Sequence, residues 1–178
     1  MGLYLIESSL QGIVSTKKEL NQKASDLQVA LTETNSALIE LQVSKDFSRS
    51  FFIIEAEDRN EATNTLRNAD IPVQLIKEVR LVGKDLEDVK KDKDVVNYLV
   101  EWNIPENITM EQYLERKKKN SVHYQEVPEV AFSRTYVCED MTKCLCFYDA
   151  PDVAAVKRAR EAVQTPIDSI TEILTENN

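Results

Sequence analysis

Three cysteines are the most closely spaced residues of this sequence that could do chemistry, and all of them lie between positions 138 and 146. Thiolates are good ligands for soft or borderline ions such as zinc, nickel and Cu(I). An odd number of cysteines in one short segment argues against a disulfide framework. The alternative is that the thiols serve as small apolar side chains of two strands. The metal ligands predicted on this basis are Cys138, Cys144 and Cys146.

Four glutamates form a second group, because the strand order derived below brings them together in pairs. We expect Glu7 to lie beside Glu78, and Glu101 to lie beside Glu172. Two buried carboxylates at short distance raise the pKa of one of them, which suits either acid–base chemistry or a hard cation. The alternative is pairing with an arginine or exposure to water, because burying an unpaired carboxylate is costly.

Two tyrosines and an arginine complete the candidates. Tyr136 and Tyr148 each offer an aromatic wall with a hydroxyl, and Arg134 could stabilise a developing anion. The single histidine, His123, lies in a polar segment and is expected to be an ordinary loop residue. The ligand-binding set predicted from the sequence is therefore Glu7, Glu78, Glu101, Glu172, Arg134, Tyr136 and Tyr148.

An internal repeat determines which elements carry these residues. Tyr4-Leu-Ile-Glu7 aligns with Tyr98-Leu-Val-Glu101, 94 positions later, and turn residues further along keep the same offset. We interpret this as a tandem duplication. Each copy shows alternating apolar segments and two helical segments in the order β-α-β-β-α-β, which is the order of the ferredoxin-like unit.

The element boundaries follow from local signals. Ser15, Thr109, Asp58 and Asp152 are expected to cap helices, and Pro72 and Pro166 are expected to open the last strands. The other strands are predicted at 2–10, 37–45, 49–56, 96–104, 131–139 and 143–150. The units are predicted at 1–82 and 95–178, separated by a charged and solvated linker at 83–94.

Alternation with a period of two separates the faces of each sheet. One face is almost wholly apolar and is expected to pack under the helices. The other is mixed, and residue parity places on it the four glutamates, all three cysteines, Tyr136 and Tyr148. Because the mixed face is too hydrophobic to stay in contact with water, the predicted fold class is α+β, with two tandem ferredoxin-like units whose sheets pack face to face as an intramolecular α+β barrel. The ligand site is expected inside that barrel.

The second copy resembles a family of small, mostly uncharacterised bacterial domains. The resemblance runs from about 96 to 174 and is carried by Tyr98-Leu-Val-Glu-Trp-Asn-Ile-Pro105, Ser133-Arg-Thr-Tyr-Val-Cys-Glu-Asp140 and Cys146-Phe-Tyr-Asp-Ala-Pro-Asp152, followed by Pro166. The described member of this family is a nickel-binding protein. The resemblance therefore implies a ferredoxin-like fold, association of two units, and binding of a divalent metal such as nickel or zinc.

Composition limits the classes of function. The chain has 178 residues, of which 30% are charged, and a net charge of −9. This charge opposes binding to nucleic acid or to anionic membranes. No apolar run is long enough to span a bilayer and the start lacks a basic region, so a cytoplasmic location is expected. An intramolecular barrel needs no second chain, so a monomer is expected.

The predicted function is binding of a small ligand or a divalent metal, with no other cofactor. Two alternatives stay open. One is a cofactor-free α+β-barrel enzyme of the isomerase, cyclase or oxygenase type, acting on a small organic molecule. The other is a structural or interaction module. Whether the chain is an enzyme is left undecided, because fold analogy does not choose between these functions.

Overall fold

The structure divides into two compact units, Met1–Val79 and Arg80–Asn178. It is a computed structural model, and it describes residues 1–91 and 94–175. The predicted linker, 83–94, is grouped with the second unit. Positions 92–93 of that linker, and 176–178 of the predicted second domain, lie outside the described residues. Among the residues that are described, no helix has both the length and the apolar character needed to cross a membrane.

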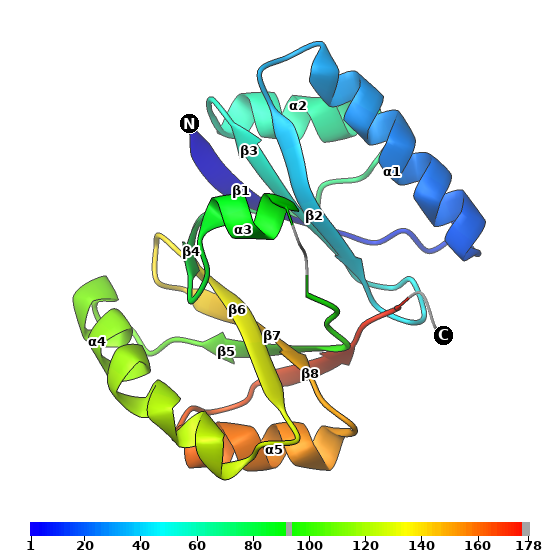
Figure 1. The fold of residues 1–178 in the computed structure, drawn as a ribbon. Helices are drawn as coiled ribbons and strands as arrows, with labels where there is room; N and C mark the ends of the chain where they lie inside the picture. The colour runs from blue at the N-terminus through cyan, green and yellow to red at the C-terminus, as the bar shows by residue number, and fades with distance from the viewer. Residues whose placement is uncertain (92–93, 176–178) are drawn as a thin grey trace. The chain divides into compact units, whose positions relative to one another are not determined.

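The first unit has the predicted order of elements (Figure 1). Its strands pair as antiparallel neighbours in the order β2-β3-β1-β4, which is the ferredoxin-like arrangement. The elements are β1 (Gly2–Ser8), α1 (Lys17–Thr32), β2 (Ala37–Val43), β3 (Ser50–Ala56), α2 (Arg59–Asn68) and β4 (Leu75–Val82).

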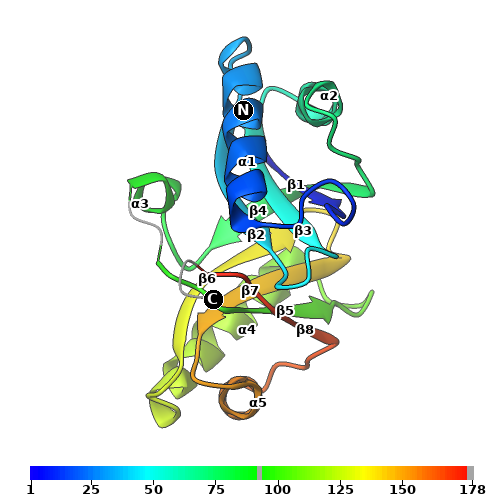
Figure 2. The ribbon, with the colours of Figure 1, turned by 90° about the vertical axis from the view of Figure 1, so that its right-hand side faces the viewer.

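The second unit repeats this order, and its strands follow the corresponding arrangement β6-β7-β5-β8. Figure 2 views α2 and α5 nearly end-on, each beside the strands of its own unit. The elements are α3 (Leu86–Lys91), β5 (Tyr98–Asn103), α4 (Met110–Asn120), the 3-10 helix η1 (Ser121–Glu126), β6 (Ala131–Cys138), β7 (Lys143–Asp149), α5 (Val153–Ala162) and β8 (Ser169–Glu172).

Two tandem ferredoxin-like units of the α+β class are therefore confirmed. Packing of the two sheets face to face stays a prediction. The segment predicted to be a solvated linker differs from expectation, because it contains α3 and because Val89 in that helix is fully buried.

Side-chain caps explain where the helices begin. Asp58 and Asp152 accept hydrogen bonds from the backbone of α2 and α5, as predicted. Thr109 caps α4 and forms a reciprocal capping box with Gln112. The prediction for α1 is wrong by one residue, since Thr16 rather than Ser15 accepts the hydrogen bond from the backbone of Glu19.

The faces of the third strands differ from the sequence prediction. In the second unit Val100 pairs with Cys146 and Trp102 pairs with Cys144. Even-numbered residues of β5 and β7 therefore share a face, whereas the prediction had placed Cys146 on the same face as Glu101. A β-bulge then shifts the register of β6 between Phe132 and Arg134. A shift of one residue moves every later side chain to the other face, and parity alone cannot reveal it.

Each unit buries its own core between its helices and one face of its sheet, which we call the helix-covered face. In the first unit this core is wholly apolar at the centre of the sheet, with Ile6, Phe52 and Ile54 packed against Leu27 and Leu66. The prediction had placed Phe52 and Ile54 on the opposite face. In the second unit the corresponding core includes Tyr98, Val100, Trp102, Tyr113, Val137, Cys144, Cys146, Tyr148, Val156 and Ala159.

Candidate functional site

The three cysteines do not form one cluster. Cys144 and Cys146 lie on the helix-covered face of the second unit. Cys138 lies on the opposite face, because its neighbour Val137 pairs with Cys144 and packs in the helix-covered core. The prediction that all three thiols share the mixed face is therefore wrong. Among the described residues, no group of three histidine, cysteine, aspartate or glutamate side chains is close enough to hold a metal ion.

The four glutamates are not paired as predicted either. Glu78 lies across the sheet from Tyr4, and Glu172 lies across from Tyr98, both on the helix-covered faces. Glu7 and Glu101 lie opposite Leu75 and Ser169, on the other faces. The pairing failed because each last strand meets the first strand in a register that the sequence does not encode locally.

Glu7 and Glu101 instead form ion pairs with neighbouring strands. Arg49 Nη2 lies 2.8 Å from Glu7 Oε1, and Lys143 Nζ lies 2.8 Å from Glu101 Oε2. Both members of the second pair follow the first by the repeat offset of 94, so the duplication preserves the contact. These pairs bridge strands within each unit, and a role for either glutamate in ligand binding stays a prediction.

The remaining predicted residues are divided between the two faces. Arg134 and Tyr136 pair with Phe147 and Leu145, which places them opposite the helices, and both are buried. Tyr148 lies under the helices rather than on the mixed face. His123 is exposed on η1, with Nδ1 2.6 Å from Glu126 Oε2, as expected for a surface histidine.

Arg160 is the polar residue that the sequence analysis missed. It lies on α5 and is only 2% exposed. Its Nη1 donates to the Tyr148 hydroxyl at 3.1 Å and its Nη2 donates to the Pro166 carbonyl at 2.7 Å. Its Nε has no hydrogen-bond partner among the described residues. Both acceptors are neutral, and no aspartate or glutamate pairs with this guanidinium in the part of the chain that the structure describes; the negative group that acts on it most is the sulfur of Cys146.

A chain of hydroxyls continues from Arg160. The Tyr148 and Tyr124 hydroxyls lie 2.6 Å apart. Burial, first of all, raises the pKa of both phenols, so each keeps its proton. Since Arg160 already donates to Tyr148, Tyr148 can donate to Tyr124, and the Tyr124 hydrogen is then left for a further acceptor.

Cys146 lies beside these groups. The Thr135 hydroxyl donates to Cys146 Sγ at 3.2 Å. A hydrogen bond from the Cys144 thiol, together with the positive charges of Lys117 and Arg160, holds the pKa of Cys146 well below its usual range, although burial acts in the opposite direction. The same contact raises the pKa of Cys144, so within the pair Cys144 holds its proton more strongly than Cys146 does.

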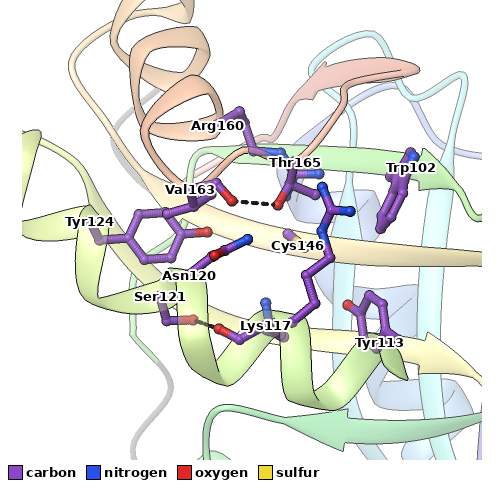
Figure 3. Close-up of a pocket in the computed structure, with 11 residues that line it drawn as sticks. Trp102, Tyr113, Lys117, Asn120, Ser121, Tyr124, Cys146, Arg160, Val163 and Thr165 are labelled. Carbon is purple, nitrogen blue, oxygen red and sulfur yellow. Dashed lines mark hydrogen bonds between the residues drawn. The ribbon is translucent and has the colours of Figure 1, made fainter. Parts of the chain in front are cut away.

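A small cavity adjoins this cluster, and Figure 3 shows the side chains that line it. Its volume is about 20 Å³, which is room for roughly one water molecule. Lys117 and Arg116 reach it from α4, where Lys117 Nζ lies 4.4 Å from the Phe132 ring centroid and Arg116 lies over Trp102. The lining residues are Trp102, Tyr113, Arg116, Lys117, Asn120, Ser121, Tyr124, Cys146, Arg160, Val163 and Thr165.

The charge of this lining is mainly positive. Three side chains are cationic, Cys146 is the one group of the lining with a lowered thiol pKa, and no described residue of the lining is an aspartate or glutamate. Arg116 is exposed at the mouth, whereas Arg160 is buried at the inner end. The chain as a whole has a net charge of −9, so this cavity is a local concentration of positive charge. A bound anion would reduce the electrostatic repulsion among these cations.

The first unit provides an internal comparison for the cluster. Cys146, Tyr148 and Arg160 correspond by the repeat offset to Phe52, Ile54 and Leu66, which are packed in the apolar core of the first unit. The fold therefore accepts apolar side chains at these positions. This comparison is also the signal that could have revealed Arg160 from the sequence, because aligning the copies sets an arginine against a core leucine.

The second unit also matches a known family. Residues 98–173 match the family described as nickel responsive protein SCO4226-like. This SCO4226-like segment covers the whole polar cluster and cavity, and it confirms the resemblance inferred from the sequence. No protein of curated function matches the chain.

Solved structures share the fold across almost the whole length. TA0507, named for chlorite dismutase, has 11% identity and a TM-score of 0.55, covering 98% of this chain and 96% of that one. A Lactobacillus acidophilus protein named as a monooxygenase has 9% identity, a TM-score of 0.54, and covers 98% and 94%. A heme-binding protein from Thermus thermophilus has 7% identity, a TM-score of 0.50, and covers 99% and 92%. At these identities the matches show the fold alone.

Proposed function

We propose that the protein is a small-ligand-binding protein and that its second unit binds a small anion in the cavity beside Arg160. The observation that carries the proposal is the buried guanidinium of Arg160, which lines the cavity, has neutral partners, and leaves Nε without a hydrogen bond among the described residues. Burying a charged group that leaves a donor without an acceptor is costly. A bound anion would give Nε an acceptor, and it would offset the excess of positive charge that one Cys146 thiolate leaves among Arg116, Lys117 and Arg160.

The rest of the lining supports the same class of ligand. Lys117 and Arg116 add positive charge between the buried end and the mouth, and Tyr124 offers a hydroxyl hydrogen. Hydrogen bonds that involve a charged group contribute about 1.5–3 kcal/mol each. The volume of about 20 Å³ favours a guest of one or two heavy atoms, such as a halide. A larger anion would require Arg116 or Lys117 to move outward.

The same geometry supports an anion more than the divalent metal predicted from the sequence. The names of the SCO4226-like family and of the heme-binding structural neighbour support small-ligand binding in general. A divalent cation in this cavity would meet three positive side chains, and no described group of three ligands is available to it. Charge repulsion therefore favours the anion over nickel or zinc at this site.

The test uses bromide as the probe and Trp102 as the reporter. Trp102 is the single tryptophan of the chain and it lines the cavity. We expect bromide to quench its fluorescence along a saturable curve at constant ionic strength. Arg160→Leu places in α5 the residue that α2 carries at Leu66, so the variant is expected to fold and to weaken bromide binding by at least about tenfold.

Arg158→Leu is the matched control. Arg158 lies on the same helix but is exposed and paired with Glu129, so this variant is expected to bind bromide as the parent does. Crystals soaked in bromide should show an anomalous peak beside Arg160 Nε. Linear, unsaturable quenching that is equal in all three proteins would refute the anion site.

A further inference from the structure

The sulfur of Cys146 forms part of the cavity wall, together with Arg160 and Lys117. It is not an isolated thiol. Thr135 donates a hydrogen bond to it at 3.2 Å, and Cys144, two residues earlier on the same face of β7, donates another. Donors and positive charge from β6, α4 and α5 are therefore directed toward one sulfur atom on β7.

This surrounding is the kind that stabilises a thiolate, and the thiolate is the nucleophilic form of cysteine. Cys138 offers a comparison within the same sheet. It lies on the opposite face, and burial raises its pKa. Cys144 also keeps its proton, because its pKa is raised by the hydrogen bond to Cys146. Of the three cysteines, only Cys146 combines thiolate character with a position on the cavity wall.

We propose that Cys146 reacts with hydrogen peroxide that enters the cavity. The thiolate attacks one peroxide oxygen, an S–O bond forms, and the O–O bond breaks. Sulfur is oxidised by two electrons to a sulfenic acid, and peroxide is reduced to one hydroxide ion, which takes a proton from solvent to become water. The inference goes beyond the proposed anion site, and it uses the same cations, because the leaving hydroxide is a small anion formed beside Arg160 and Lys117.

The cations and the size of the cavity give this reaction its selectivity. Negative charge develops on the departing oxygen, and Arg160, whose Nε is free of partners among the described residues, is a donor next to that position. Hydrogen peroxide has two heavy atoms, whereas an alkyl hydroperoxide exceeds a cavity of about 20 Å³. Cys144 is expected to position the thiolate through its hydrogen bond rather than to attack peroxide itself.

The experiment follows the oxidation of each cysteine in the full, reduced chain. The protein is exposed to hydrogen peroxide, catalase stops the reaction, and the chain is unfolded in the presence of an alkylating reagent. Mass spectrometry of peptides then reports which thiols were lost. Since thiolate content falls about tenfold for each unit of pKa, Cys146 is expected to be oxidised at least about tenfold faster than Cys138. tert-Butyl hydroperoxide is expected to oxidise Cys146 far more slowly.

Variants separate this proposal from the anion site. Thr135→Val keeps the shape of the side chain and removes the hydroxyl donor, so it is expected to slow oxidation of Cys146 while leaving bromide quenching of Trp102 unchanged. Cys138→Ser is expected to react as the parent does. Bound bromide should slow the oxidation of Cys146 in the parent protein.

Two results would overturn the inference. One is oxidation of Cys138 and Cys146 at equal rates, and the other is a Cys146 that survives peroxide while bromide still binds. If Cys146 is oxidised selectively but bromide quenching is unsaturable, the peroxide reaction stands and the anion-binding function fails.

Discussion

The Cys146→Ser variant provides a quantitative test of the polar cluster, because a shifted pKa makes stability depend on pH. In the folded chain, the hydrogen bond from Cys144 and the charges of Lys117 and Arg160 hold the pKa of Cys146 well below its usual range. In the unfolded chain the thiol has a pKa of about 8.5. The folded state therefore binds fewer protons between these two values, and its stability must rise with pH there.

The sign and size follow from linkage. The contribution of the thiolate is fully present above about pH 8.5 and is lost as the pH falls through the depressed folded pKa. Within that window the difference in unfolding free energy between the parent and Cys146→Ser should rise by up to about 1.4 kcal/mol per pH unit. Serine has no charge to lose at these pH values, so its other effects on packing add a constant offset.

The assay is urea unfolding under reducing conditions at steps between about pH 6 and about pH 8.5. Cys138→Ser is the control, because burial raises the pKa of Cys138, and below about pH 8.5 its thiol is protonated in both states. A difference for Cys146→Ser that is flat across this range, or that matches the Cys138→Ser profile, would refute the view that Cys146 is a thiolate held by the surrounding donors.

The repeated ion pairs and one helix cap give further predictions. A double-mutant cycle on Glu101 and Lys143, whose side chains are 7% and 15% exposed, should give a coupling of about 1–2 kcal/mol in urea unfolding. The corresponding cycle on Glu7 and Arg49, which are 12% and 36% exposed, should give at most about 1 kcal/mol, and a larger value there would contradict screening by solvent. Thr16→Ala should lower the free energy of unfolding by about 1 kcal/mol, whereas Ser15→Ala should lower it by only about a few tenths of a kcal/mol. Equal losses for the two variants would contradict the assignment of Thr16 as the N-cap.

The sequence was sufficient for the order of elements, because that order depends on local signals. Asp58, Asp152 and Thr109 cap helices as predicted, since an N-cap requires only a side-chain acceptor next to a helical segment. The repeat strengthened the prediction, because each element had to occur at equivalent positions of both copies. The class and the tandem ferredoxin-like units followed from these signals alone.

The candidate site was not predictable in the same way, because it depends on strand register. Cys146 and Tyr148 moved to the helix-covered face when β7 paired with β5 through residues of equal parity. The bulge between Phe132 and Arg134 also reverses which residues of β6, odd-numbered or even-numbered, lie on the helix-covered face. Arg160 was missed for a different reason, since an arginine in a charged helix normally extends into water. What distinguishes Arg160 in the sequence is that the equivalent position of the first copy, 94 residues earlier, is Leu66.

The two bulges bear on how the chain acquired its second half. The first unit shifts register between Leu38 and Glu40, and the second shifts between Phe132 and Arg134, at equivalent positions. One insertion inherited by both copies is a simpler history than two insertions at the same place. A half-length ancestor that already carried the bulge accounts for both register shifts with a single event. The two units share this backbone and differ in chemistry: the first has an apolar interior, and the second holds a guanidinium beside the sulfur of Cys146.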